Sequence, residues 1–219
     1  MAEKEMANPT IRIETREQLL YTLTEAAEIE HNLMCCYLYA AFSMKTGEDE
    51  GLNAEQSEAV KRWRQSIVHV AVDEMTHLAL VSNLMVAIGG APHFGRPNFP
   101  ITPGYHPAGV QVDLAPFNAD TLQHFVYLER PEGSDEVDGD GFASALAYHC
   151  ELGSAQRLMP SGQDYETVGE LYHAVAQGLA HLCERDGEDC IFVGGTERQA
   201  LHPCAPLSHR RAAYFFGEC

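Results

Sequence analysis

The stretch VAVDEMTHLALV, from Val70 to Val81, decides how this chain folds and what it can bind. Apolar residues fall on most sides of the helix that this stretch would form, which is typical of a helix packed into a core. Yet Glu74 and His77, three residues apart and therefore neighbours on a helix, lie in its middle. Because an unpaired charge costs several kcal/mol in an apolar interior, the stretch predicts a buried helix whose polar groups are compensated by something else.

Around this stretch the sequence predicts four helices and no sheet. Thr15 to Gln18 has the capping-box pattern of a helix start, and Gly89-Gly90 is typical of a helix end. Only Cys190 to Val193 resembles a strand. The predicted helices cover about residues 16–45, 54–89, 118–130 and 165–185. We therefore expect residues 1–219 to form a single all-α domain, a four-helix bundle with a long crossover between its second and third helices and an irregular C-terminal tail.

The predicted crossover, residues 91–116, contains six of the eleven prolines together with several aromatic residues. This composition indicates an ordered connection and not a flexible linker. The connection over residues 91–116 is our candidate for the lid of a substrate pocket. Residues 141–160 are expected to form a short helical insertion.

The composition excludes some classes of partner. Lysine and arginine number 14 against 32 acidic residues, a net charge of −18, which argues against nucleic acid or an anionic membrane as partner. We find no run of about 18 apolar residues that would span a bilayer and no secretory signal in Met1 to Asn8. Seven cysteines, an odd number without a C-x-x-C pair, favour reduced thiols and a cytoplasmic location. Association into a homo-oligomer stays open.

Each predicted helix places a carboxylate on its apolar stripe. These are Glu30, Glu74, Glu129 and Glu170, and the second and fourth are followed three residues later by His77 and His173. The free-energy cost of burying four carboxylates and two imidazoles would be prohibitive unless cations neutralise the carboxylates. Oxygen-rich ligation with one nitrogen per ion suits iron or manganese. The pattern therefore predicts a dinuclear metal site of the kind found in carboxylate-bridged four-helix bundles.

Alternatives remain for single residues. Glu170 also fits a capping box that begins at Thr167, and Glu129 could be an exposed acid that ends its helix. Asp73 could orient a ligand histidine through its second ring nitrogen or form an ion pair on the helix flank. Tyr37, on the same face as Glu30, could hydrogen-bond near the metals, line a pocket or be an ordinary core tyrosine.

The segments that carry these residues resemble a known family. AEIEHNLMCCYLYAAFSM, VAVDEMTHLALVSNLMVAIGGAPHFGRPNFP, FVYLERPE and YETVGELYHAVAQGLAHL are similar to the ferritin-like domain related to iminophenyl-pyruvate dimer synthases of bisindole biosynthesis. The resemblance covers roughly residues 16–195. It implies a ferritin-like bundle with a dinuclear metal site, and work on amino-acid-derived imines in secondary metabolism.

The resulting hypothesis is an oxidoreductase with two iron ions, manganese being the alternative, that activates dioxygen to oxidise a small substrate. In it Glu74 and Glu170 bridge the ions, Glu30 and Glu129 hold them terminally, and the two histidines complete the sites. A ferroxidase or iron-storage protein is one rival, and a metal-free interaction bundle is the other.

Overall fold

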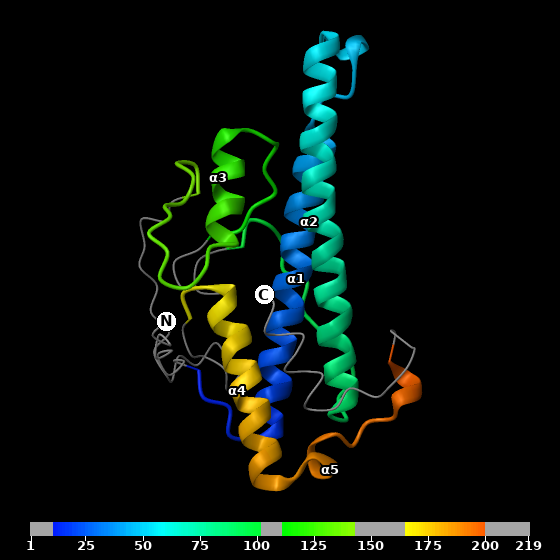
Figure 1. Cartoon of the computed structure of the whole chain (residues 1–219), viewed down its shortest axis with the longest axis vertical. Helices are drawn as coiled ribbons and strands as arrows, with labels where there is room; N and C mark the ends of the chain where they lie inside the picture. Colours follow the sequence, from blue (N-terminus) through cyan, green and yellow to red (C-terminus); the bar gives the residue numbers. More distant parts are fainter. Residues whose placement is uncertain (1–10, 102–110, 143–164, 200–219) are drawn as a thin grey trace, which may run out of the picture.

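Two long antiparallel helices, α1 (Arg16–Ser43) and α2 (Ala54–Ala87), lie side by side along most of the computed structural model (Figure 1). The structure describes residues 11–101, 111–142 and 165–199. Within these ranges it contains no strand, only one isolated bridge between Ile101 and Val112. The expectation of an all-α fold is confirmed.

Capping interactions set where α1 begins. The Thr15 hydroxyl accepts a hydrogen bond from the backbone N–H of Gln18 at 3.1 Å, and the Gln18 side chain accepts one from the backbone N–H of Thr15 at 3.1 Å. This reciprocal pair is the predicted capping box, and it satisfies donors that the first helical turn leaves unpaired.

Local interactions also fix both ends of α2. Asn53 and Gln56 form a second capping box at its start, with hydrogen bonds of 2.8 and 3.0 Å. At its end Gly89 adopts a φ of 82°, and the N–H of Gly90 donates to the carbonyl of Met85 at 2.8 Å. A positive φ is accessible to glycine at little cost, so the predicted Gly-Gly terminus is confirmed.

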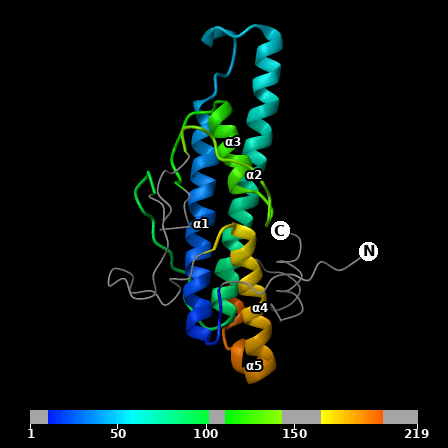
Figure 2. The same ribbon diagram turned by 90° about the vertical axis from the view of Figure 1, so that its left-hand side faces the viewer.

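The other helices are shorter than the sequence suggested. Helix α3 (Ala119–Leu128) has only 10 residues, and α4 (Val168–Asp186) has 19. Both lie alongside the α1 and α2 pair, as the two views in Figures 1 and 2 agree. The bundle therefore has two long and two shorter helices, and the predicted ranges 118–130 and 165–185 differ from the observed bounds by at most three residues at each end.

The prediction of an extended segment from Cys190 to Val193 was wrong for its first two residues. The structure forms a short helix there, α5 (Glu188–Ile191), with 3-10 turns at η1 (Glu48–Glu50) and η2 (Thr196–Arg198) elsewhere. Glu188 and Asp189 occupy the first turn of α5, where negative charge is favourable beside the helix dipole. The expected insertion over residues 141–160 lies, beyond its first two residues, outside the described residues.

The core lies between α1, α2 and α4. Its largest fully buried side chains include Leu19, Leu23, Tyr37, Leu84, Ile88, Leu171, Leu179 and Leu182. Where α4 meets the segment before α1, a Cβ on Gly178 would come within 2.5 Å of Ile13. This close approach holds α4 tightly against the N-terminal part of the chain.

The described parts of the proline-rich connection pack on α1. The Phe94 ring lies 5.2 Å from the His31 ring, and the N–H of Gly95 donates to the Glu28 carboxylate at 3.1 Å. Just after the connection, the N–H of Phe117 donates to the Ser43 hydroxyl at 2.8 Å. The connection is thus anchored along α1, and its role as a lid stays a prediction.

By length and composition alone, α2 could cross a membrane, since one window of 18 residues reaches a mean hydropathy of 1.2. The fold buries 44% of that window. Core helices of soluble proteins meet the same criterion, so this is weak evidence for a membrane segment.

Replacing Thr15 with alanine should lower the free energy of unfolding by about 1 kcal/mol, because it removes the side-chain acceptor at the start of α1. Urea denaturation followed by circular dichroism measures this. Ser66→Ala is the matched control, since it removes a hydroxyl from an exposed position inside α2. Equal stability of Thr15→Ala and the wild-type protein would contradict the capping role.

Candidate metal centre

Glu30 and Glu74 are buried because each lies on the apolar stripe of its helix. On α1 the buried residues Leu23 and Leu33 flank Glu30, and on α2 Ala71 and Val81 flank Glu74. The two glutamates are only 1% and 4% exposed. The packing of α1 on α2 thus brings two carboxylates into the interior.

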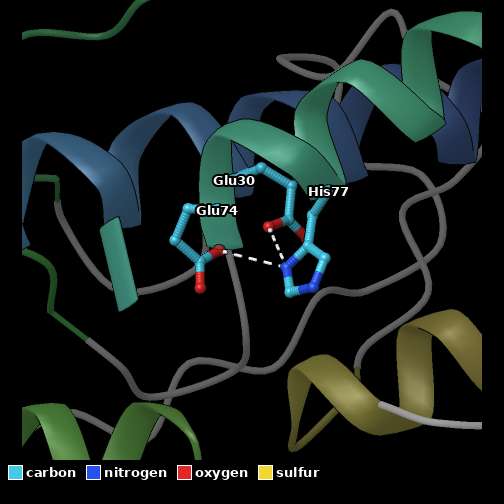
Figure 3. A group of neighbouring side chains, drawn as sticks. All are labelled: Glu30, Glu74 and His77. Carbon is cyan, nitrogen blue, oxygen red and sulfur yellow. Dashed lines mark ion pairs between the residues drawn. The ribbon is translucent and has the colours of Figure 1, made fainter. Parts of the chain in front are cut away.

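His77 completes a cluster with these two carboxylates, as Figure 3 shows. Its Nδ1 lies 3.3 Å from Oε2 of Glu30 and 3.6 Å from Oε2 of Glu74. The three residues each offer a ligand atom, and these atoms lie within 4.8 Å of one another. Ligands that are each about 2.1 Å from one ion lie at most about 4.2 Å apart, so small side-chain adjustments would suffice to bind an ion.

The cluster has more negative than positive charge. Even with His77 protonated, two carboxylates face one cation, and no lysine or arginine in the described part of the chain forms an ion pair with Glu30 or Glu74. Burial raises the pKa of Glu74 to about 8, and the neighbouring Glu30 carboxylate raises it as well, while His77 acts in the opposite direction. The site therefore favours a cation, or a proton in its place.

One oxygen of the cluster also lacks a hydrogen bond. Oε2 of Glu30 is buried and has no hydrogen-bond partner among the described residues. A buried carboxylate oxygen without a partner is costly, and a divalent cation between Glu30, Glu74 and His77 would satisfy it. The donor set, two carboxylates and one imidazole, fits iron or manganese.

Glu129 lies beside the cluster and is held there by Tyr37. The Tyr37 hydroxyl, on a side chain only 1% exposed, donates a hydrogen bond to Oε1 of Glu129. Burial raises the pKa of Glu129, and the charge of Glu74 raises it further. The residue as a whole is exposed, so its carboxylate reaches inward from the surface. Of the roles considered for Tyr37, the structure supports hydrogen bonding to a predicted ligand.

The end of α3 positions Glu129. Glu129 is the C-cap residue, and Pro131 follows two residues later. The guanidinium of Arg130 donates to the carbonyls of Tyr127 and Glu166, both at 2.7 Å, and lies 3.7 Å above the Tyr127 ring. Arg130 thereby ties the end of α3 to the segment just before α4.

Glu170 and His173 lie outside the cluster. The Glu170 carboxylate accepts a hydrogen bond from the backbone N–H of Glu166 at 2.8 Å, and its own N–H donates to Thr167 at 3.1 Å. Both hydrogen bonds lie at the start of α4. They resemble the capping box that was the alternative role for Glu170. His173 lies 2.6 Å from the side chain of Gln177. The structure thus assembles three of the six predicted ligands, with a fourth adjacent, and ligation by Glu170 and His173 stays a prediction.

Asp73 is exposed, and no hydrogen bond or ion pair joins it to His77 or to another residue in the described ranges. The suggestion that it orients a ligand histidine stays a prediction without a contact in this structure.

Sequence reasoning missed Tyr172. This α4 residue is 6% exposed, and its hydroxyl donates a hydrogen bond to Oε1 of Glu30. The apolar stripe of α4 could have indicated that Tyr172 is buried. The inward face of this helix includes Leu171, Val175 and Leu179, and Tyr172 lies on it.

The helical fold agrees with the family to which the chain is similar. A family model described as Ferritin-like matches residues 23–209. No solved structure matches the chain.

Two curated proteins are related to the chain. A dichlorochromopyrrolate synthase from Lentzea aerocolonigenes is 26% identical over 217 residues, which cover 87% of this chain and 20% of that protein. A 2-imino-3-(indol-3-yl)propanoate dimerase from Chromobacterium violaceum is 31% identical over 138 residues, 55% of this chain and 14% of that protein. The chain thus spans a fifth or less of the length of these relatives. The resemblance to dimer synthases is confirmed.

The metal-free protein should lose stability as the pH rises. The pKa of Glu74 is about 8 in the folded chain but about 4.3 in an unfolded one, so unfolding releases a proton between these values and a higher pH favours it. We expect the free energy of unfolding of chelator-treated protein to fall by about 3 kcal/mol between about pH 5 and 8.

Glu74→Gln is the control for this prediction, because it keeps the size of the side chain and removes its titration. The variant should lose clearly less stability over the same pH range in urea denaturation. If the two proteins lost stability in parallel, a raised pKa at Glu74 would be wrong.

Proposed function

The chain belongs to the ferritin-like family, and on that premise we propose that it is a dinuclear metal oxidoreductase that uses dioxygen to oxidise a small organic substrate. The observation that carries the proposal is the buried cluster of Glu30, Glu74 and His77. The cluster has an excess of negative charge, and Oε2 of Glu30 is buried without a hydrogen bond. A divalent cation would compensate both. The relatives are named a synthase and a dimerase, which supports an enzyme over a scaffold.

In this proposal Glu30, Glu74 and His77 hold the first ion, through oxygen and Nδ1 donors that the fold already brings together. Glu129, kept beside them by Tyr37, is the nearest further carboxylate for the second ion. Glu170 and His173 complete that second position. For this, Glu170 gives up its hydrogen bond with the backbone of Glu166, and His173 gives up its contact with the side chain of Gln177. Iron is the proposed metal, with manganese as the alternative.

When bound, a pair of redox-active ions supplies the electrons that reduce dioxygen. The simplest balanced reaction removes two electrons and two protons from the substrate and converts dioxygen to hydrogen peroxide. One relative is named for an indole-bearing imino acid, so we propose an amino-acid-derived substrate of secondary metabolism. The protein would contribute the buried carboxylates of Glu30 and Glu74, which hold the ions in place relative to the substrate.

Metal content tests the proposal first. Protein expressed with iron and manganese supplied should contain about two redox metals per chain by mass spectrometry, as a site of this composition requires. A metal-free preparation that takes up none would overturn the proposal and favour the interaction bundle. A large excess over two would favour iron storage.

Two variants separate the two ion positions. Glu74→Ala should remove nearly all bound metal, because its carboxylate belongs to the assembled cluster, whereas Glu170→Ala should reduce the content from about two ions to about one. Both should abolish oxygen uptake by the ferrous protein. Glu184→Ala, an exposed substitution on α4, serves as the control. Wild-type uptake by Glu170→Ala would show that Glu170 is not a ligand.

A further inference from the structure

Helix α4 already reaches the assembled cluster through Tyr172. The hydroxyl donates to Oε1 of Glu30, and both side chains are buried, at 6% and 1% exposed. A hydrogen bond from a neutral donor to a buried carboxylate is strong because one partner is charged. It also fixes the rotation of the carboxylate group about its last bond.

The consequence concerns the other oxygen of the same carboxylate. With Oε1 engaged by Tyr172, Oε2 of Glu30 lies 3.3 Å from Nδ1 of His77 and has no hydrogen-bond partner among the described residues. Glu30 therefore presents one oxygen, and only one, to the position between Glu74 and His77.

We propose that Tyr172 is a positioning residue that makes Glu30 a monodentate ligand of the metal, by occupying Oε1 and directing Oε2 into the cluster. This inference rests on the proposed function, since it needs a metal at Glu30, Glu74 and His77. Hydrogen-bonded partners of metal ligands typically contribute about 10-fold to 100-fold in metal affinity. Tyr172 also makes the first ion position depend on the docking of α4.

A purely structural role is the alternative, because a tyrosine that bonds to a glutamate across two helices also joins those helices. The chain offers a matched example of that role. The Tyr165 hydroxyl donates to Oε1 of Glu25 at 2.8 Å, and Tyr165, just before α4, is 3% exposed. Glu25 lies on α1 as Glu30 does, yet it is not part of the cluster.

The test compares Tyr172→Phe with Tyr165→Phe, using Co²⁺ alone as the probe in metal-free protein. Affinity is measured by calorimetric titration, ligand geometry by the visible absorption of bound Co²⁺, and the fold by thermal unfolding without metal. Without the hydroxyl, the Glu30 carboxylate is no longer held in one orientation, so Tyr172→Phe should weaken Co²⁺ binding about 10-fold. Because both oxygens of Glu30 can then reach the ion, the Co²⁺ spectrum should also change. Tyr165→Phe should leave affinity and spectrum unchanged.

The spectrum decides between the two roles. A Tyr172→Phe spectrum that superimposes on that of the wild-type protein overturns the proposal, whatever the affinity, and so does an equal change in Tyr165→Phe. If Tyr172→Phe does not fold, Tyr172→Met replaces it, since methionine fills an irregular space of similar reach without a hydroxyl. A wild-type protein that binds no Co²⁺ overturns the proposed function itself and this inference with it.

Discussion

Two carboxylates that face each other in a helical interior are the constraint on which the rest of the structure depends. Glu30 and Glu74 lie on different helices, so the packing of α1 against α2 cannot form without bringing their charges together. His77 compensates one charge at most, and the pKa of Glu74 is raised mainly by burial and further by the neighbouring Glu30 carboxylate. A bound cation would convert this repulsion into a link between the two helices.

The surrounding elements hold the cluster from several sides. Capping boxes fix where α1 and α2 begin, Arg130 connects the end of α3 to the approach to α4, and two buried tyrosines bond to the carboxylates of Glu129 and Glu30. The shorter helices thus orient the acids, and α4 also contributes Leu171, Leu179 and Leu182 to the core. Orientation of ligands by neighbouring hydrogen bonds is typical of metal sites in helical bundles.

The sequence predicted the all-α fold, and three of its six candidate ligands, Glu30, Glu74 and His77, lie together in the structure, for identifiable reasons. On α1 and α2, Glu30 and Glu74 follow the spacing of the apolar residues, so periodicity alone placed them inside. On α4 the inward face follows Leu171, Val175 and Leu179, so that Tyr172 lies inside while Glu170 lies at the start of the helix, and ligation by Glu170 stays a prediction. Glu129 follows the last residue of a short helix, where the direction of a side chain depends on tertiary contacts such as the bond from Tyr37. No local pattern encodes those contacts.

The central claim is that a metal ion binds between Glu30, Glu74 and His77. X-ray diffraction from crystals grown with Fe²⁺ or Mn²⁺ under exclusion of oxygen, with data collected on both sides of the absorption edge of the metal, tests it most directly. We expect an anomalous peak within about 2.3 Å of the three side chains. Well-ordered density for these residues without any anomalous peak, at saturating metal, would contradict it.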